Sequence, residues 1–418
     1  MELISRPSYM DTLLTLKKIP DIKVITGIRR CGKSSLLELF IAHVEQTEPK
    51  ANIIHINLVQ KENEHLLNAQ ALYEFIEGQY KKGCENIVCI DEIQMCEDFE
   101  KAVSWLYESR KYNIYITGSN AFLLSGDLAT LFTGRSFEIE VYPFSLSEFM
   151  DYFSLSDANE ALDRYIRFGG MAGAYPLDNA ALQARYINSV FTTLIIRDIQ
   201  TKYHIRDMPL LQKITDYLLD NIANLTSVRN ITAALSIESA ASNNTVSAYI
   251  QHLCNAYLFY RVRRYDIAGK KYLATQDKYY LCDHSFRYAR LGTKNMDYGR
   301  TLENIVALEL MRRGYEVYVG VLYKKEIDFV AVRQHEKIYI QVAEDISSPE
   351  TFKRECEPLE KIRDSYPKMI LARTRHETYD YEGIKICDAA EWLCNPSLTV
   401  EPISHQKLPL TSHIFSRK

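Results

Sequence analysis

Residues 27–34 read Gly-Ile-Arg-Arg-Cys-Gly-Lys-Ser, which matches the pattern GxxxxGK[ST]. An apolar strand, predicted over residues 23–26, runs into this stretch, and an apolar-periodic helix, predicted over 34–43, leaves it. Glycines let such a loop fold back, so that backbone N–H groups converge on phosphate oxygens at the helix N-terminus. The lysine is expected to reach the β- and γ-phosphates, and the first serine hydroxyl to ligate Mg²⁺. The stretch therefore predicts a nucleotide site with these binding residues: Gly27, Gly32, Lys33, Ser34 and Ser35. Arg30 lies inside the same loop, at a position that the pattern leaves open.

The sequence around this loop predicts an α/β fold with a parallel sheet. Short apolar runs alternate with helical patterns over the first 145 residues, as in sheets that helices cover on both faces. The predicted strands are 23–26, 53–57, 87–90, 114–117 and 137–141, and the helices between them are 34–43, 69–81 and 99–109.

The amino-acid composition limits which classes of protein and partner are compatible with this chain. The chain has 418 residues, 47% hydrophobic and 25% charged, which excludes wholesale disorder and suggests two or three domains. The net charge of −4 gives no global indication of a nucleic-acid or membrane partner. No apolar run approaches the length of a membrane span and charges occur early, so we expect a cytoplasmic protein. Nine scattered cysteines without a CxxC pair favour neither a zinc knuckle nor a disulfide framework.

Two acidic residues follow the predicted strand 87–90. Asp91 is expected to bind the Mg²⁺ shell, and Glu92 to polarise the attacking water, which separates a hydrolase from a nucleotide holder. The next strand ends in Gly118-Ser119-Asn120. Either Ser119 or Asn120 is predicted to hold the same water or the γ-phosphate; the alternative is a simple turn.

Several stretches resemble an AAA+ type P-loop ATPase of the prokaryotic family with a C-terminal domain of unknown function. They are VITGIRRCGKSSLL (24–37), INL (56–58), IVCIDEIQ (87–94), YITGSNAFLLSGDLATLFTGR (115–135), EVYPFSLSEF (140–149) and YIRFGGMAGAYP (165–176). The resemblance implies ATP as the nucleotide, a core over 1–144 and a helical lid over 145–204. It also implies that Arg135 is an arginine finger or γ-phosphate sensor, with a salt bridge to the sheet as the alternative.

Residues 205–291 are predicted to form a winged-helix-like domain of three helices and a hairpin. The segment 261–300 carries ten Lys or Arg residues against four Asp residues. Such a basic hairpin is compatible with DNA binding through the phosphate backbone, and equally with contact to a protein partner or a second copy.

Residues 292–397 resemble the PD-(D/E)XK nuclease fold, with carboxylates at Glu303, Glu326 and Asp328. Gln341 stands where that fold needs its second acid, and Ala343 where it needs its lysine. Glutamine holds Mg²⁺ poorly and alanine cannot orient water, so we interpret this part as a nuclease-like fold without cleavage activity. Residues 398–418 are predicted to be a tail.

Three functions are compatible with the sequence. The leading hypothesis is ATP hydrolysis that drives a conformational switch or motor acting on an unidentified partner. The alternative is a nucleic-acid-binding regulator with slow or structural use of ATP, and the third is a nuclease gated by ATP. The acidic pair favours hydrolysis over the second, and the residues at 341 and 343 argue against the third.

Overall fold

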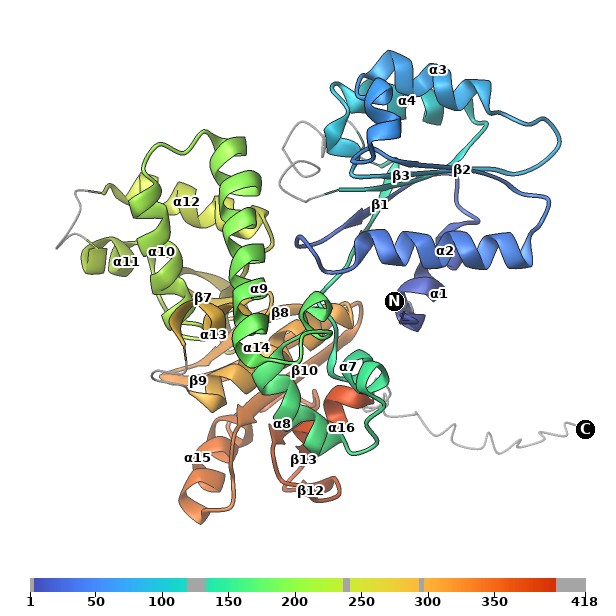
Figure 1. The fold of residues 1–418 in the computed structure, drawn as a ribbon. Coiled ribbons are helices and arrows are strands. Elements are labelled where there is room, and N and C mark those ends of the chain that lie inside the picture. Colours follow the sequence, from blue (N-terminus) through green and yellow to red (C-terminus); the bar gives the residue numbers. More distant parts are fainter. Residues whose placement is uncertain (1–3, 119–131, 133, 236–240, 293–296, 396–418) are drawn as a thin grey trace, which may run out of the picture.

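The protein is described from a computed structural model, which covers residues 4–118, 132, 134–235, 241–292 and 297–395. The first lobe, at the top right of Figure 1, is a five-stranded sheet in the order β2-β3-β4-β1-β5, with every neighbouring pair parallel. Its strands are β1 (Ile22–Thr26), β2 (Asn52–Asn57), β3 (Asn86–Asp91), β4 (Asn113–Thr117) and β5 (Ser136–Glu140). The predicted parallel sheet is confirmed.

Helices cover both faces of this sheet. One face carries α1 (Pro7–Leu16) and α2 (Lys33–Thr47), and the other carries α3 (Ala69–Gly78) and α4 (Phe99–Ser109) (Figure 1). β1 and β3 are buried along their whole length, because each lies inside the sheet between two strands and beneath helices. Two short 3-10 helices, η1 (Lys61–Leu66) and η2 (Ile93–Met95), lie in the connections.

A helical segment follows the first sheet. It comprises α7 (Leu146–Phe153), α8 (Ala158–Phe168), the short η3 (Ala172–Ala174), and α9 (Ala180–Thr193). α7 begins at a capping box, in which the Ser145 side chain accepts from the Glu148 N–H and the Glu148 carboxylate accepts from the Ser145 N–H. α9 continues into a π-helical stretch, η4 (Leu194–Thr201). π-Helical turns are rare and often occur at functional sites.

The second lobe contains an eight-stranded sheet. Three helices, α10 (Met208–Asp220), α11 (Val228–Leu235) and α12 (Asn243–Asn255), precede the hairpin of β6 (Phe259–Asp266) and β7 (Lys271–Leu281). The strand order is β12-β13-β11-β10-β9-β8-β6-β7. The remaining elements of this lobe are α13 (Ser285–Leu291), α14 (Tyr298–Arg312), β8 (Glu316–Leu322), β9 (Lys325–Arg333), β10 (Glu336–Ala343), α15 (Pro349–Glu360), β11 (Lys368–Ala372), β12 (Tyr379–Tyr381), β13 (Ile384–Asp388) and α16 (Ala389–Cys394).

This sheet crosses the domain boundary expected at residue 291. The hairpin was expected to belong to a winged-helix-like domain that ends at residue 291, but β6 pairs in parallel with β8 beyond that boundary, at Arg264–Val319 and Asp266–Val321. The hairpin and the C-terminal region therefore share one sheet and one continuous set of backbone hydrogen bonds. The predicted tail over 398–418 lies outside the described residues.

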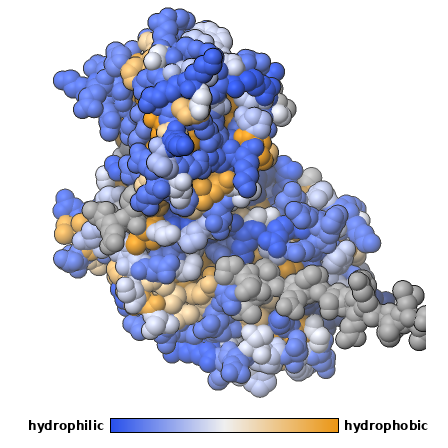
Figure 2. Space-filling view, turned by 90° about the vertical axis from the view of Figure 1, so that its right-hand side faces the viewer, coloured by the Kyte–Doolittle hydropathy of each residue, from blue (hydrophilic) through white to orange (hydrophobic). Residues whose placement is uncertain are grey.

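The surface shown in Figure 2 is mostly hydrophilic, and its apolar patches are small and separated. None of the helices in the described part of the chain combines the length and apolar composition needed to cross a bilayer.

Candidate functional site

The loop between β1 and α2 depends on two glycines in left-handed or otherwise restricted conformations. Gly27 has φ +134°, and a Cβ atom there would lie 2.2 Å from the carbonyl oxygen of Val141. Gly32, with φ +99°, is the N-cap of α2. Only glycine adopts these angles without strain, so the loop can turn back over the helix N-terminus.

Arg6 holds this loop in place through hydrogen bonds of its guanidinium group. Its guanidinium is 2% exposed and forms two hydrogen bonds with the Glu148 carboxylate, at 2.7 and 3.0 Å. The same group donates to the carbonyl oxygens of Cys31, at 3.2 Å, and Tyr142, at 2.9 Å. The side chain therefore connects the loop to the segment between β5 and α7. Nothing in the local sequence pattern indicated this role.

Lys33 and the serines after it lie in the first turn of α2. The Lys33 ammonium donates to the carbonyl oxygens of Gly27, at 2.9 Å, and Ile28, at 3.0 Å, within the loop itself. Ser34 and Ser35 are half-buried beside it. The N–H groups of this first helical turn and the lysine make the loop suited to bind phosphate.

The Asp91 carboxylate lies at the carboxyl end of β3 and is 2% exposed. It accepts hydrogen bonds from the hydroxyls of Ser34, at 3.1 Å, and Thr117, and from the Asn57 amide, at 3.0 Å. Asn57 and Thr117 end the two neighbouring strands. The structure thus brings Ser34 and Asp91 together, as the sequence predicts, and adds two residues that hold the carboxylate in position.

Glu92 directly follows β3 in a left-handed conformation, with φ 55°. Its backbone N–H donates to the Thr117 hydroxyl at 3.1 Å, and its half-buried carboxylate accepts a hydrogen bond from Gln94. The left-handed turn points the chain away from the strand immediately after Asp91. The two acids therefore have different surroundings, which suits two different roles.

These residues fit ATP and Mg²⁺. A P-loop magnesium ion is held by one hydroxyl, one carboxylate, phosphate oxygens and water rather than by a protein cage. Ser34 and Asp91 supply that hydroxyl and carboxylate, 3.1 Å apart.

The other predicted site residues lie elsewhere or are not described. Ser119 and Asn120 lie outside the described residues. Arg30 is exposed in the loop, with φ 68°. The arginine with a partner there is Arg29, which the motif did not single out: its guanidinium donates to both Asp198 oxygens, at 3.0 and 2.9 Å.

Arg135 lies at the opposite end of the sheet from its own loop. It precedes β5, which pairs in parallel with β1 from Ile22–Ser136 to Thr26–Glu140, so the strand length of about 13 Å separates it from the loop. Its guanidinium pairs with Glu108 of α4 at 2.7 Å. The Arg135 guanidinium is therefore remote from the phosphate loop of its own chain, and its ion pair is with α4 instead of with the sheet.

The Arg29–Asp198 pair connects the loop to the π-helix η4. The Asp198 side chain is 5% exposed and the Arg29 side chain 22%. The hydrogen bonds to Asp198 raise the pKa of the Arg29 guanidinium above its ordinary value, and the charge of Glu92 raises it further. Glu92 is therefore close enough to influence the same guanidinium electrostatically.

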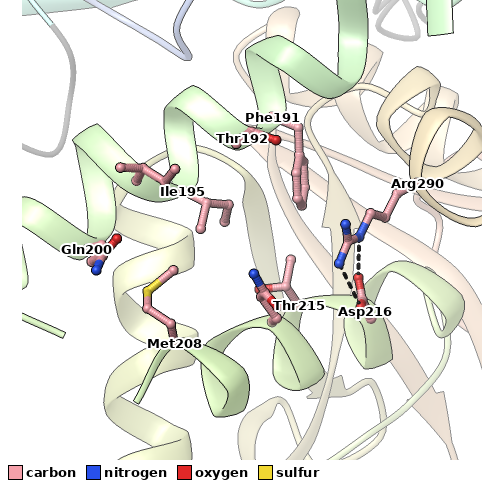
Figure 3. A pocket seen from close by; sticks show the side chains of 10 residues that line it. Phe191, Thr192, Ile195, Gln200, Met208, Thr215, Asp216 and Arg290 are labelled. Carbon is pink, nitrogen blue, oxygen red and sulfur yellow. Dashed lines mark hydrogen bonds and ion pairs between the residues drawn. The ribbon is translucent and has the colours of Figure 1, made fainter. Parts of the chain in front are cut away.

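η4 also borders a pocket of about 140 Å³ (Figure 3). Phe191 and Ile195 face into it from α9 and η4, opposite Met208 and Thr215 of α10. The Asp216–Arg290 ion pair, at 2.8 and 3.1 Å, closes one end. The helix that contacts the loop through Asp198 therefore also lines a pocket that it shares with α10.

Two tyrosines connect the sheet edge to the second lobe. The Tyr257 hydroxyl donates to Glu138 at 2.6 Å and lies 3.0 Å from the hydroxyl of Thr26, the residue directly before the loop. The Tyr260 hydroxyl donates to Glu140 at 2.6 Å. Burial raises the pKa of Glu140 to about 7.

Among the described residues of segment 261–300, at least five cations already pair with acids inside the chain. They are Arg261 with Asp277, Lys278 with Glu303 and Glu326, Arg287 with Asp220, Arg290 with Asp216, and Arg300 with Asp297. Lys294 lies outside the described residues. The surplus of positive charge available to an external partner is therefore smaller than the sequence indicates.

In the C-terminal region the structure brings Glu303, Glu326 and Asp328 together. A lysine lies among them, although Ala343 occupies the position where sequence reasoning looked for one. It is Lys278 of β7, whose ammonium lies 2.7 Å from Glu303 and 2.8 Å from Glu326. Its sequence surroundings, an alternating strand with charged neighbours, did not distinguish it.

Comparison with known proteins identifies two segments. Residues 20–150 match the family described as "AAA domain", and residues 159–297 match a domain of unknown function, DUF8612. The chain is 37% identical to an uncharacterized protein of Haemophilus influenzae over 398 residues, covering 94% of this chain and 98% of that one. It is 28% identical to the uncharacterized protein MJ1544 of Methanocaldococcus jannaschii over 407 residues, covering 92% and 88%.

The solved structures that align with this chain are less similar to it in sequence than these two relatives are. The Walker-type ATPase PABY2304 of Pyrococcus abyssi aligns with a TM-score of 0.46 and 17% identity, covering 68% of this chain and 95% of that one. AMPPCP-bound DnaA of Aquifex aeolicus aligns with a TM-score of 0.31 and 18% identity, covering 59% and 85%. By its 37% identity over most of both chains, the chain belongs to the same family as the Haemophilus influenzae protein, and its residues 20–150 match the AAA domain, which supports a P-loop ATPase.

Proposed function

We propose that this protein hydrolyses ATP with Mg²⁺ and uses the nucleotide state as a conformational switch acting on a partner. The observation that carries the hydrolytic part is the 3.1 Å hydrogen bond between Ser34 and Asp91, which joins the phosphate loop to the acidic strand end. When bound, Mg²⁺ neutralises phosphate charge. Lys33 binds the β- and γ-phosphates, Ser34 and Asp91 hold the ion, and Glu92 orients the attacking water and accepts its proton.

The supporting residues have less direct roles. Ser119 or Asn120 holds the water or the γ-phosphate, while Gly27, Arg30, Gly32 and Ser35 shape the loop. Arg135 acts on the nucleotide of a neighbouring copy, since its exposed guanidinium is remote from its own loop. Residues 1–144 work as the core and 145–204 as the lid.

The switch rests on the contact between Arg29 and Asp198. Bound phosphates would put negative charge beside Arg29, which already pairs with a carboxylate on η4. Arg29 then interacts with two anions, the phosphates and the Asp198 carboxylate. Nucleotide binding therefore weakens the contact between Arg29 and Asp198 of η4, and hydrolysis restores that contact. Since η4 faces a pocket on its other side, it can respond to this change.

Glu92→Gln tests the assignment of the base. Lys33→Ala should abolish ATP binding, whereas Glu92→Gln should keep binding and lower the rate of phosphate release by about 10²–10⁴-fold. Glu97→Gln, which changes an exposed acid in the same segment, is the matched control. Wild-type turnover in Glu92→Gln would show that another group is the base.

The alternative, a nucleic-acid-binding regulator, has one supporting feature: Arg263, Lys270 and Lys271 are exposed on the β6–β7 hairpin. DNA binding through this segment should weaken steeply with salt. Binding that is absent or insensitive to salt would favour a protein partner or self-association.

A further inference from the structure

The Lys278 ammonium is buried in the centre of a carboxylate cluster. The side chain is 3% exposed and reaches from β7 to Glu303 of α14, at 2.7 Å, and Glu326 of β9, at 2.8 Å. The Asp328 carboxylate, also on β9, lies 3.7 Å away. Three carboxyl groups from two elements thus surround one ammonium group from a third element.

Other groups hold these carboxylates in position. The Tyr280 hydroxyl donates to Glu303 at 2.7 Å, and the Val342 N–H donates to Asp328 at 2.8 Å. The Gln341 side chain accepts from the Asp328 N–H and donates to the Glu355 carboxylate, both at 2.9 Å. Two of the carboxylates, Glu303 and Asp328, therefore each accept a further hydrogen bond that fixes their orientation, as ligands of cation sites commonly do.

The electrostatics are consistent with a permanently charged lysine. Burial alone would lower the pKa of Lys278, but attraction by Glu303, Asp328 and Glu326 outweighs burial and raises the pKa above its ordinary value. Burial and the charge of Glu303 raise the pKa of Asp328 to about 8. A lysine held protonated cannot accept a proton from water.

We propose that the Lys278 ammonium stands in the place of a divalent cation, so that this carboxylate cluster is a cation site filled by the chain itself. An ammonium supplies positive charge and three hydrogen-bond donors, and its 2.7–2.8 Å contacts keep Glu303 and Glu326 apart. Mg²⁺ would need oxygens at about 2.0–2.1 Å in nearly octahedral order, which the lysine side chain blocks. The site therefore neither takes up metal nor activates water.

The filled site also joins two parts of the chain. Lys278 lies within the segment 159–297 that matches DUF8612, whereas Glu303, Glu326 and Asp328 lie beyond it. The cluster thus fastens the C-terminal region to that segment without a metal ion, next to the β6–β8 pairing.

The test is a gain of metal binding when the lysine is removed. Lys278→Ala leaves three carboxylates without their cation, so its affinity for Mn²⁺, measured by calorimetry without nucleotide, should exceed that of the wild type at least tenfold. Mn²⁺ should also raise its melting temperature. Lys337→Ala is the matched control, because Lys337 is also largely buried (16% exposed) but has a single carboxylate, Asp364, at 4.0 Å. Asp328→Asn added to Lys278→Ala should abolish the gain.

Two results would overturn the proposal. One is a folded Lys278→Ala protein that binds Mn²⁺ no more tightly than Lys337→Ala. The other is measured on the wild-type protein by chemical modification of lysine, so it does not depend on the folding of a variant. Lys278 should react with an amine-modifying reagent more slowly than Lys337, and millimolar Mn²⁺ should not change its rate. Faster modification of Lys278 when Mn²⁺ is added would mean that metal displaces the lysine.

Discussion

Replacing Asp198 with asparagine should tighten ATP binding. The Asp198 carboxylate forms two hydrogen bonds with Arg29, at 3.0 and 2.9 Å, and its side chain is 5% exposed. Hydrogen bonds between charged groups contribute about 1.5–3 kcal/mol net. If phosphate binding must weaken this pair, that free energy opposes binding in the wild type. Asp198→Asn removes this opposing free energy and frees Arg29. Affinity for ATP should therefore rise roughly ten- to hundredfold, since 1.4 kcal/mol corresponds to a factor of ten.

The assay is equilibrium titration with Mg-ATP in a Glu92→Gln background, in which turnover does not deplete the ligand. Asp216→Asn is the matched control. Its carboxylate makes the same two-bond contact with Arg290, at 2.8 and 3.1 Å, at the lining of the pocket. The control should leave affinity unchanged. An affinity for ATP in Asp198→Asn that equals or falls below that of the control would refute the role given to this pair.

Protein stability gives a second readout of the same pair. Arg29→Ala leaves a buried carboxylate without its partner, which should cost about 3–5 kcal/mol of unfolding free energy. Asp198→Asn leaves a guanidinium that is 22% exposed and can reach water, so it should cost less. Adding Asp198→Asn to Arg29→Ala should therefore recover stability. Equal losses in the two single variants would contradict the asymmetry in burial.

Three further predictions concern the rest of the site. Mixing Arg135→Ala with Glu92→Gln subunits should partly restore ATP turnover, and turnover per subunit should rise with protein concentration; concentration-independent hydrolysis without rescue would exclude a role between copies. Gly27→Ala should lower the free energy of unfolding by about 2–4 kcal/mol and abolish ATP binding, because its Cβ would meet a carbonyl oxygen at 2.2 Å; normal melting and binding would contradict the close packing. Burial raises the pKa of Glu140 from 4.5 to about 7, so its folded form binds more protons between these values and stability falls as pH rises through them; Glu140→Gln should remove that fall, by about 3 kcal/mol at most, in denaturant titrations at pH 5 and 8.

The ATPase sheet could be predicted from the sequence because its information is local. Each strand is a short apolar run, and the phosphate loop fixes what precedes and follows it. The second sheet was harder to predict. β11, β12 and β13 are three to five residues long, and the whole of β12 is exposed, so no apolar periodicity marks it.

The candidate site also contains residues that local sequence patterns reveal and residues that they do not. Lys33, Ser34 and Asp91 lie in motifs, so residue spacing was enough to find them. Asp198 is separated from Arg29 by 169 residues, and its position depends on how the π-helix folds back over the loop. The contact between Lys278 and its carboxylates is likewise non-local, since Lys278 lies on β7 and the carboxylates lie on α14 and β9. Pairings of this kind follow from tertiary structure and leave no local signal.

The pairing of β6 with β8 has a consequence for how the chain is made. The ATPase sheet is complete once Glu140 has left the ribosome, whereas β6 must wait for β8, which ends at Leu322, before its outer edge is covered. Until then the hairpin presents unpaired N–H and C=O groups, which are prone to join another chain. A gene fragment that stops near residue 297 would preserve that open edge permanently. Its product should therefore aggregate or pair with itself, even though it contains the whole phosphate loop and both matched segments.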